Sequence, residues 1–209
     1  LLHLGQIANY RGELDAARTL LEQCLAVARD IKSIDIEGEC ELHLGEAAFD
    51  AGIPDKAAQH FKRSLIVCRE GGDKRGEANA LWHLGQIDLQ GADVASARSR
   101  LAESLQSFNA FGMRAELLGC LEDCAALARL ELRKDDAARL VGAIDIARER
   151  LNLRRAPRAE EHWSMQLAAL QGVLPAGEFE SARDEGRQWQ IDDAVRGALA
   201  APAAEAVTA

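Results

Sequence analysis

Leu81-Trp82-His83-Leu84-Gly85 is the most informative stretch of this sequence, because two earlier stretches resemble it at a constant 40-residue spacing. Leu42-His43-Leu44-Gly45 and Leu2-His3-Leu4-Gly5 share its His-Leu-Gly core, and residues 121–125 hold the fourth place in altered form. An alanine and, four residues later, an apolar side chain recur on the same period: Ala17 and Leu21, Ala57 and Phe61, Ala97 and Leu101, Ala137 and Val141. A fixed period of about 20–50 residues is typical of repeat architectures. The sequence therefore predicts stacked copies of one structural unit.

The composition predicts an all-α protein. Apolar residues make up 48% of the 209 residues, aromatic residues only 4%, and there are four prolines. Alanine and leucine dominate, and both favour helices. The net charge of −9 argues against direct binding to nucleic acid, which needs clustered Lys and Arg. No apolar run reaches the roughly 18–20 residues that cross a bilayer, and nothing at the start resembles a secretory signal.

The five cysteines are an odd number, and most of them fall at helix positions that suit small core residues: Cys24, Cys40, Cys68, Cys120 and Cys124. We expect buried, reduced thiols in a cytoplasmic protein. Cys120 and Cys124 lie four residues apart without a second ligand pair, so packing is favoured over a metal half-site.

Each 40-residue unit is expected to form two antiparallel helices. The expected pairs are residues 1–10 and 13–30, 34–51 and 54–71, 73–91 and 93–111, and 113–132 and 134–152. Gly12, Gly52 and Gly91 mark turns, and Ser33 is the expected N-cap of the third helix. Pro54 suits the first position of a helix, where its missing N–H costs nothing.

The two ends of the chain differ from the repeats between them. Subtracting one period from the start near Ile34 places the start of the first helix before residue 1, so we expect this chain to be a piece of a longer polypeptide. After residue 152 the period fails. Residues 158–172, 176–188 and 191–200 predict three shorter helices that cap the array, and residues 201–209 predict a disordered tail. The expected organisation is a repeat array over 1–152 and a cap over 153–200.

The repeat resembles the tetratricopeptide (TPR) pattern, which places Leu-Gly in the first helix and Ala-x3-apolar in the second. Leu44-Gly45 followed by Ala57 and Phe61 is one example. The signature proline near the repeat end is missing, and the 40-residue unit is longer than the common form, which has about 34 residues. The resemblance implies a right-handed superhelical solenoid of about four helical hairpins that binds a protein or peptide partner in its concave groove without catalysis.

A second resemblance lies in the C-terminal part, in residues 137–143, 179–187 and 191–195. These segments look like the closing segment of large multidomain bacterial regulators of the LuxR-type, ATP-binding class. The resemblance implies the sensor or scaffold part of a signalling or transcriptional regulator. The alternative is a free-standing assembly scaffold that self-associates, for example as a homodimer.

The repeated histidines belong to a set of polar and aromatic residues expected to face the groove. His3, His43 and His83 share one repeat position with Asp123, and Trp82 precedes its histidine. The same face is expected to carry Gln6, Glu46 and Gln86 three residues on, and Tyr10, Asp50 and Gln90 one turn beyond. They either offer hydrogen bonds to a partner or hydrogen-bond neighbouring helices to each other, and the sequence leaves both open. Packed helices lie about 8–10 Å apart, too far for equivalent residues to share one metal ion.

No other motif points to chemistry, so the sequence predicts neither an enzyme nor a cofactor. Gly71-Gly72-Asp73-Lys74 lacks the Gly-Lys-Ser/Thr ending of a phosphate-binding loop, and no strand precedes it. The arginines at 148, 150, 154, 155 and 158 form the one basic cluster. They are either a solvated helix end or a docking site for an acidic surface.

Overall fold

The computed structural model describes residues 1–172 and 174–201, apart from the side chain of residue 158, and these residues form 11 α-helices joined by short turns. The all-α prediction is confirmed. The chain divides into two compact units, residues 1–91 (unit 1) and residues 92–209 (unit 2). From residue 202 onward, the expected tail lies outside the described residues.

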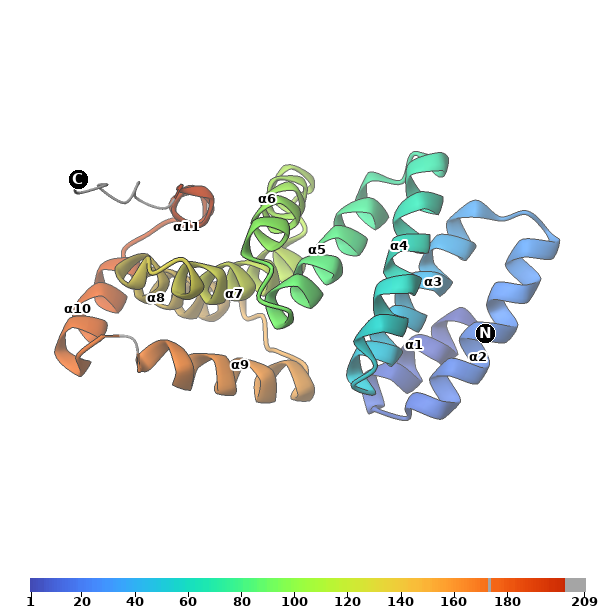
Figure 1. The fold of residues 1–209 in the computed structure, drawn as a ribbon, viewed down its shortest axis with the longest axis horizontal. Helices are drawn as coiled ribbons and strands as arrows, with labels where there is room; N and C mark the ends of the chain where they lie inside the picture. The colour runs from blue at the N-terminus through green and yellow to red at the C-terminus, as the bar shows by residue number, and fades with distance from the viewer. Residues whose placement is uncertain (173, 202–209) are drawn as a thin grey trace. The chain divides into compact units, whose positions relative to one another are not determined.

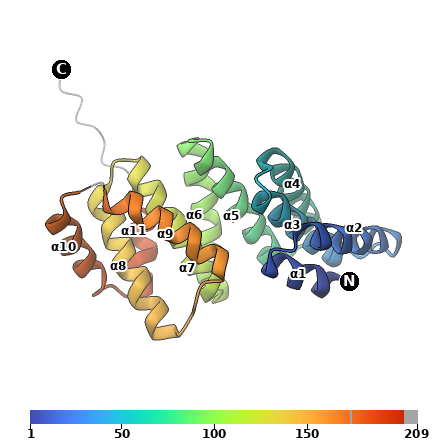
Figure 2. The same ribbon diagram turned by 90° about the horizontal axis from the view of Figure 1, so that it is seen from below.

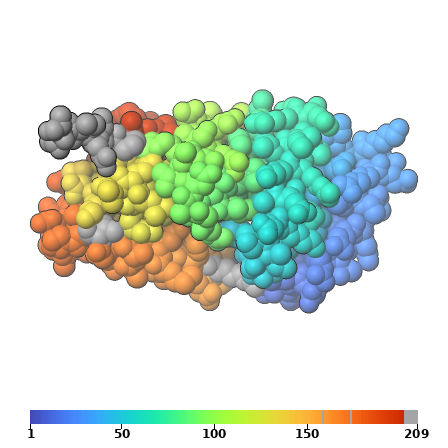
Figure 3. Space-filling model, viewed as in Figure 1, coloured from blue at the N-terminus to red at the C-terminus, as the bar shows by residue number. Residues whose placement is uncertain are grey.

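Unit 1 contains five helices that form sequential antiparallel hairpins (Figure 1). They are α1 (Leu2–Arg11), α2 (Leu14–Asp30), α3 (Ile34–Asp50), α4 (Pro54–Gly71) and α5 (Lys74–Gln90). Each helix packs against the next one, and the first helices of successive hairpins, α1, α3 and α5, also contact one another. In the space-filling view, atoms of α4 form much of the near face of this unit (Figure 3).

The Leu-Gly and Ala-x3-apolar motifs meet inside each hairpin. A Cβ atom on Gly5 would lie 2.6 Å from Leu21 Cγ, and one on Gly45 would lie 2.4 Å from Phe61 Cε1. Both contacts are closer than van der Waals radii allow, so glycine makes the room that Leu21 and Phe61 occupy, and both side chains are fully buried. The motif therefore specifies how the two helices of a hairpin pack.

The turns between helices recur at half the repeat period. A residue with positive φ stands at every twentieth position, in this order: Gly12, Lys32, Gly52, Gly72, Ala92, Gly112, Leu132 and Asn152. Within residues 1–152 the left-handed residue follows each helix and allows the chain to reverse. Gly91 lies in the turn that follows α5, as predicted; it has φ −80°, and the left-handed residue of that turn is Ala92. Ser33 is the N-cap of α3, but its side chain makes no capping hydrogen bond.

Unit 2 contains the remaining six helices: α6 (Val94–Phe111), α7 (Arg114–Leu130), α8 (Lys134–Leu151), α9 (Pro157–Gln171), α10 (Ala176–Gly186) and α11 (Ile191–Leu199). Helix α7 packs between α6 and α8, as the hairpin pattern predicts. Helices α10 and α11 pack on α8, and α9 lies along α7 and α8 (Figures 1 and 2).

Helices α8 and α10 cross at two glycines. A Cβ atom on Gly142 would lie 1.9 Å from the carbonyl oxygen of Arg183, and one on Gly186 would lie 1.9 Å from that of Arg139. The two backbones thus touch directly. Two ion pairs stabilise the crossing, Arg139 with Glu185 at 2.8 Å and Arg183 with Asp145 at 2.7 Å.

The five cysteines are buried and form no disulfide, as predicted from their helix positions. Burial raises the pKa of the Cys40 thiol to about 12, so this thiol stays protonated at neutral pH. None of the described helices combines the length and the apolar character that crossing a membrane requires.

Candidate functional site

Six of the residues expected to face the groove form one chain of side-chain hydrogen bonds along α1, α3 and α5. We call this chain the polar ladder; its members are His3, Gln6, His43, Glu46, His83 and Gln86. At its N-terminal end, His3 Nδ1 lies 2.9 Å from Gln6 Oε1, and Gln6 Nε2 lies 2.7 Å from His43 Nε2. The Gln6 amide thus connects α1 to α3.

Glu46 continues the polar ladder from α3 to α5. One of its carboxylate oxygens lies 2.8 Å from His43 Nδ1, and the other lies 3.3 Å from His83 Nε2. His83 Nδ1 lies 2.9 Å from Gln86 Oε1. The His83 ring also stacks between Phe61 at 4.8 Å and Trp82 at 5.1 Å, measured between ring centroids. The imidazole is therefore held at its edge and on its ring faces.

The 40-residue period explains why the polar ladder is continuous. Within each helix a histidine pairs with the polar residue three positions on, because residues i and i+3 share a helix face. Between helices the polar residue pairs with the histidine 37 positions on, which belongs to the next repeat. One step of each kind together spans one repeat.

The hydrogen bonds of the polar ladder shift the pKa values of Glu46 and His43. Burial alone would raise the pKa of Glu46, but the hydrogen bonds from His43 and His83 outweigh it and hold that pKa well below its usual range. Burial alone would lower the pKa of His43, but the hydrogen bond to Glu46 and its negative charge raise it. When His43 gains a proton at Nε2, a flip of the Gln6 amide presents Oε1 to that proton and Nε2–H to His3. The ladder can thus accept a proton without losing a hydrogen bond.

The structure places the other predicted residues of α1, α3 and α5 around this row. Tyr10, Asp50 and Gln90 lie exposed near the C-terminal ends of their helices, with Tyr10 66% exposed. His43 and His83 are mostly buried, with 18% and 14% of their side chains exposed. Bonding between helices, one of the two alternatives left open by the sequence, is therefore what the ladder does. Partner binding by the surrounding face stays a prediction.

The fourth predicted position, Asp123, lies in unit 2 beneath helix α9. It is 3% exposed, and Gln166 Nε2 of α9 lies 3.4 Å from its Oδ1. Glu122 beside it pairs with Arg148 at 2.7 Å and with Arg155 at 2.8 Å. On α7, then, the face corresponding to Trp82 and His83 is covered by another helix of the same chain.

Neither prediction for the arginine cluster describes Arg148 and Arg155. Both are largely buried and neutralise Glu122, whose pKa is raised by burial although the two arginines oppose this shift. Arg155 also lies over the ring of Trp163, 4.7 Å from its centroid, and so connects the start of α9 to α7. The side chain of Arg158 lies outside the described residues.

Sequence reasoning missed Glu41, whose side chain is completely buried. Its carboxylate lies 2.7 Å from Arg29 Nη2 and 2.7 Å from His60 Nδ1, and so connects α2, α3 and α4. The signal was present in the repeat, because the equivalent positions 1, 81 and 121 are all leucine. A carboxylate at a core position of one repeat indicates a buried ion pair.

The other missed contact recurs with the repeat. Arg29 Nε donates to Glu37 at 2.9 Å, and Arg69 Nε, one repeat later, donates to Glu77 at 2.6 Å. Each pair joins the second helix of one hairpin to the first helix of the next. Two arginines and two glutamates on the same period were the available signal.

The arrangement offers hydrogen bonds and stacked rings, and no set of groups for catalysis emerges in the part of the chain that the structure describes. Within residues 1–172 and 174–201, no cluster of three His, Cys, Asp or Glu side chains could hold a metal ion. The polar ladder itself runs from helix to helix and does not converge on a point where a substrate atom could sit.

Comparison with known proteins supports the repeat interpretation. No family model matches the chain. A crystal structure of nearly identical TPR-like repeats, from a Podosopora anserina protein described as a putative kinesin light chain, superimposes with a TM-score of 0.57. The identity is 16%, over 94% of this chain and 92% of that chain. A crystal structure of a single-residue variant of the same repeats gives a TM-score of 0.58. The fold is TPR-like. At this identity the likeness concerns the fold alone.

Proposed function

We propose that this TPR-like chain is a non-catalytic protein-binding module whose partner lies along α1, α3 and α5. The observation that carries the proposal is the polar ladder. Its hydrogen bonds fix the three helices side by side, and they present Tyr10, Asp50 and Gln90 from equivalent positions. A face already ordered in this way binds with little loss of conformational entropy.

The chain itself suggests what kind of partner fits. Helix α9 covers the equivalent face of α7 and contributes Trp163, which is 3% exposed, and Gln166, which contacts Asp123. A helix with an aromatic anchor and an amide therefore suits this face of a first helix. We infer that the partner of α1, α3 and α5 presents an amphipathic helix, one of the recurring modes of peptide recognition.

Photo-crosslinking from the proposed face tests this function. A photoreactive phenylalanine analogue would replace Tyr10 in one sample, Gln90 in a second, and Ile66 of α4 in a control. Ile66 is 57% exposed and lies on a second helix of a hairpin. We expect the same partner protein to be crosslinked from positions 10 and 90, and not from position 66.

Affinity measurements with the purified partner complete the test. Tyr10→Ala combined with Gln90→Ala should weaken binding about tenfold or more, since aromatic anchors carry much of the binding energy, whereas Ile66→Ala should leave it unchanged. Crosslinks from position 66 alone, or equal affinity of the double variant, would overturn the assignment of the face.

Self-association is the second candidate function, because one apolar face of α1 is uncovered. Leu4 is 57% exposed and Ile7 is 48% exposed. The residues equivalent to Leu4 in the next two repeats, Leu44 and Leu84, are 3% and 2% exposed, because the second helix of the preceding hairpin covers them. Such a face associates with another apolar helix.

Sedimentation distinguishes the two functions. If a second copy covers α1, the wild-type chain sediments as a dimer at micromolar concentration, and Leu4→Glu with Ile7→Glu sediments as a monomer. A monomeric wild type excludes the scaffold. Because neither substitution touches the polar ladder, partner binding can be measured on the same variant.

We also propose that the module is the sensor or scaffold part of a bacterial signalling or transcriptional regulator. The support is the resemblance of residues 137–143, 179–187 and 191–195 to the closing segment of such proteins. These segments belong to α8, α10 and α11, which pack together in unit 2. The sequence encoded upstream of Leu1 tests this proposal: a nucleotide-binding or DNA-binding module supports it, and an unrelated sequence opposes it.

A further inference from the structure

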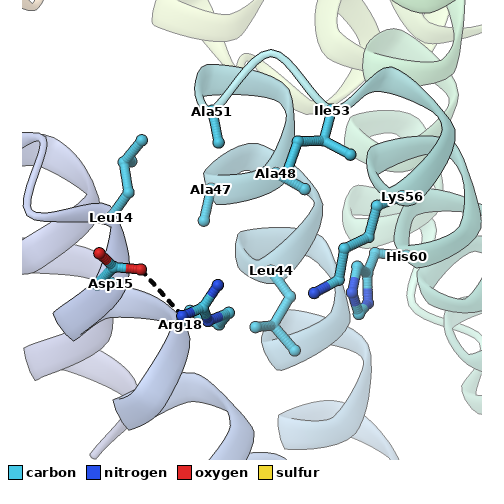
Figure 4. A pocket seen from close by; sticks show the side chains of 10 residues that line it. All are labelled: Leu14, Asp15, Arg18, Leu44, Ala47, Ala48, Ala51, Ile53, Lys56 and His60. Carbon is cyan, nitrogen blue, oxygen red and sulfur yellow. Dashed lines mark hydrogen bonds and ion pairs between the residues drawn. The ribbon is translucent and has the colours of Figure 1, made fainter.

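Unit 1 has a cleft on a different face of α3 from the polar ladder. It lies between the second helices α2 and α4, with α3 as its floor, and it encloses about 60 Å³ (Figure 4). The floor consists of Leu44, Ala47, Ala48 and Ala51, and Leu14 and Ile53 form apolar walls. His43 and Glu46 point to the neighbouring first helices, so the cleft and the ladder are separate sites.

The cleft exists because α3 carries alanine where its neighbours carry a larger residue. Ala47 corresponds to Ile7 in the first repeat and to Ile87 in the third. An isoleucine at position 47 would occupy the space above the floor. The open space is therefore a property of the second repeat.

The rim of the cleft is basic although the chain as a whole carries a net charge of −9. Arg18 of α2 and Lys56 of α4 extend toward Leu44 from opposite walls (Figure 4). Asp15 holds Arg18 at 2.9 Å, but Lys56 is half-buried and has no carboxylate within ion-pair distance among the described residues. His60 lines the cleft beside Lys56, and its ring is fixed by the bond from Nδ1 to Glu41.

A partly buried lysine beside an apolar floor suits an anion with a hydrocarbon group attached. The cleft is small and has room for a few water molecules or one small branched hydrocarbon group. Pockets for drug-sized ligands and cofactors measure about 300–1,000 Å³, which excludes them here.

We propose that this cleft binds a short branched aliphatic carboxylate of about four or five carbon atoms. The methyl groups lie on Ala47 and Ala48, and the carboxylate accepts hydrogen bonds from Lys56 at the rim. Arg18, already paired with Asp15, adds positive potential on the opposite wall. Charge and volume together specify this ligand class.

Titration with 3-methylbutanoate, followed through the methyl NMR signals of labelled alanine and leucine, tests the proposal. We expect saturable shifts at the floor, in the millimolar range typical of so small a ligand. Acetate lacks the branched hydrocarbon and 3-methylbutanamide lacks the charge, so both should bind at least about tenfold more weakly.

Three variants connect these shifts to the cleft. Ala47→Ile copies the residue of the two neighbouring repeats and should abolish binding. Lys56→Gln should weaken binding about tenfold, and Lys62→Gln, an exposed lysine of the same helix, should leave it unchanged. Should Ala47→Ile fail to fold, Ala51→Leu obstructs the cleft from an exposed position and should have the same effect.

Three outcomes would overturn the proposal. They are no saturable shift with 3-methylbutanoate, equal binding of its amide, and undiminished binding by Ala47→Ile or Ala51→Leu. Since none of these substitutions alters the polar ladder or Tyr10, failure here leaves the proposed protein-binding function untouched.

Discussion

Glu46 joins two repeats through a single carboxylate, with His43 of its own helix on one oxygen and His83 of the next repeat on the other. Its side chain is 31% exposed, so water screens these bonds only in part. Hydrogen bonds to a charged group contribute about 1.5–3 kcal/mol each to stability. Glu46 is therefore the member of the polar ladder whose removal should cost most.

Glu46→Gln should lower the free energy of unfolding by about 2 kcal/mol at pH 5–6.5. The raised pKa of His43 means that its contribution is complete below about pH 6.5 and is lost as pH rises through the folded-state value. The lowered pKa of Glu46 means that its contribution is complete above about pH 4.3 and is lost as pH falls. Urea unfolding at several pH values measures the difference.

The matched control is Glu22→Gln, which removes an exposed carboxylate from α2. Its effect should stay within about 0.5 kcal/mol at every pH. A loss in Glu46→Gln that is the same at pH 5.5 and pH 9 would show that the carboxylate does not act through the histidines.

The residues of the polar ladder could be predicted from the sequence because they recur with the motif that places the helices. What each side chain contacts could not. A step of 37 positions joins Gln6 to His43 only if adjacent first helices pack at the right height, and that follows from the packing of Leu21 and Phe61 on Gly5 and Gly45. Asp123 shows how far the repeat pattern can predict contacts. It is covered by α9, which lies beyond the part of the chain that follows the 40-residue period.

At the scale of the helix, the left-handed turn residues give a second prediction. Lys32, Ala92 and Leu132 hold positive φ at 56°, 57° and 60°, which costs a residue with a Cβ atom about 1–2 kcal/mol. Replacing any of the three by glycine should raise the free energy of unfolding by about 0.5–1 kcal/mol, after the added entropy of the unfolded chain is subtracted. Thermal melts followed by circular dichroism measure this gain.

Gly52→Ala is the reverse control for these turns. Nothing lies within 4 Å of a Cβ atom at Gly52, whose φ is +72°, so only the backbone conformation is affected. This change should cost about 1 kcal/mol. Stabilisation by Gly52→Ala, or destabilisation by Leu132→Gly, would contradict this account of the turns.

The close crossing of α8 and α10 predicts that one added methyl group lowers the stability of the protein strongly. Gly186→Ala places its Cβ against the backbone of Arg139, so the helices must separate, at a cost of about 3 kcal/mol. Gly177→Ala, in the same helix with nothing within 4 Å, should change stability by less than about 0.5 kcal/mol. Urea unfolding compares the two variants. Similar losses in both would mean that the backbones do not need this close approach.

Most helices could be predicted to within two residues, because the 40-residue period carries the helix ends that glycine and proline mark over to the repeats that lack these residues. The crossing of α8 and α10 could not be predicted, since Gly142 and Gly186 lie outside the 40-residue pattern and their spacing fits no repeat. Gly91 marked the turn after α5 correctly, but not which residue of that turn is left-handed. The left-handed residue is the next one, Ala92, with φ 57°.

Across the whole chain, burial is uneven. In α1, three of ten residues are buried, because one face is uncovered; in α7, ten of 17 are buried. Stability in stacked repeats is a sum of local terms and contacts between neighbours. Amide hydrogen exchange followed by mass spectrometry should therefore show earlier exchange in α1 than in α7.

Binding of a second copy to the exposed face of α1 should slow hydrogen exchange in that helix. If a second copy binds there, raising the protein concentration slows exchange in α1 while α9 to α11 stay as they were, and Leu4→Glu removes the effect. Exchange in α1 as slow as in α7 in the dilute monomer would show that the exposed face is not a weak point.

The regular placing of the left-handed residues has a practical consequence for the gene. Since reversals fall at equal intervals, a cassette of 40 codons contains one complete hairpin together with both of its turns. Excising residues 34–73 would join Ser33 to Lys74 and leave every later reversal at its proper interval, and inserting a second copy would do the same. The protein can accordingly be shortened or lengthened by whole repeats without redesigning a junction.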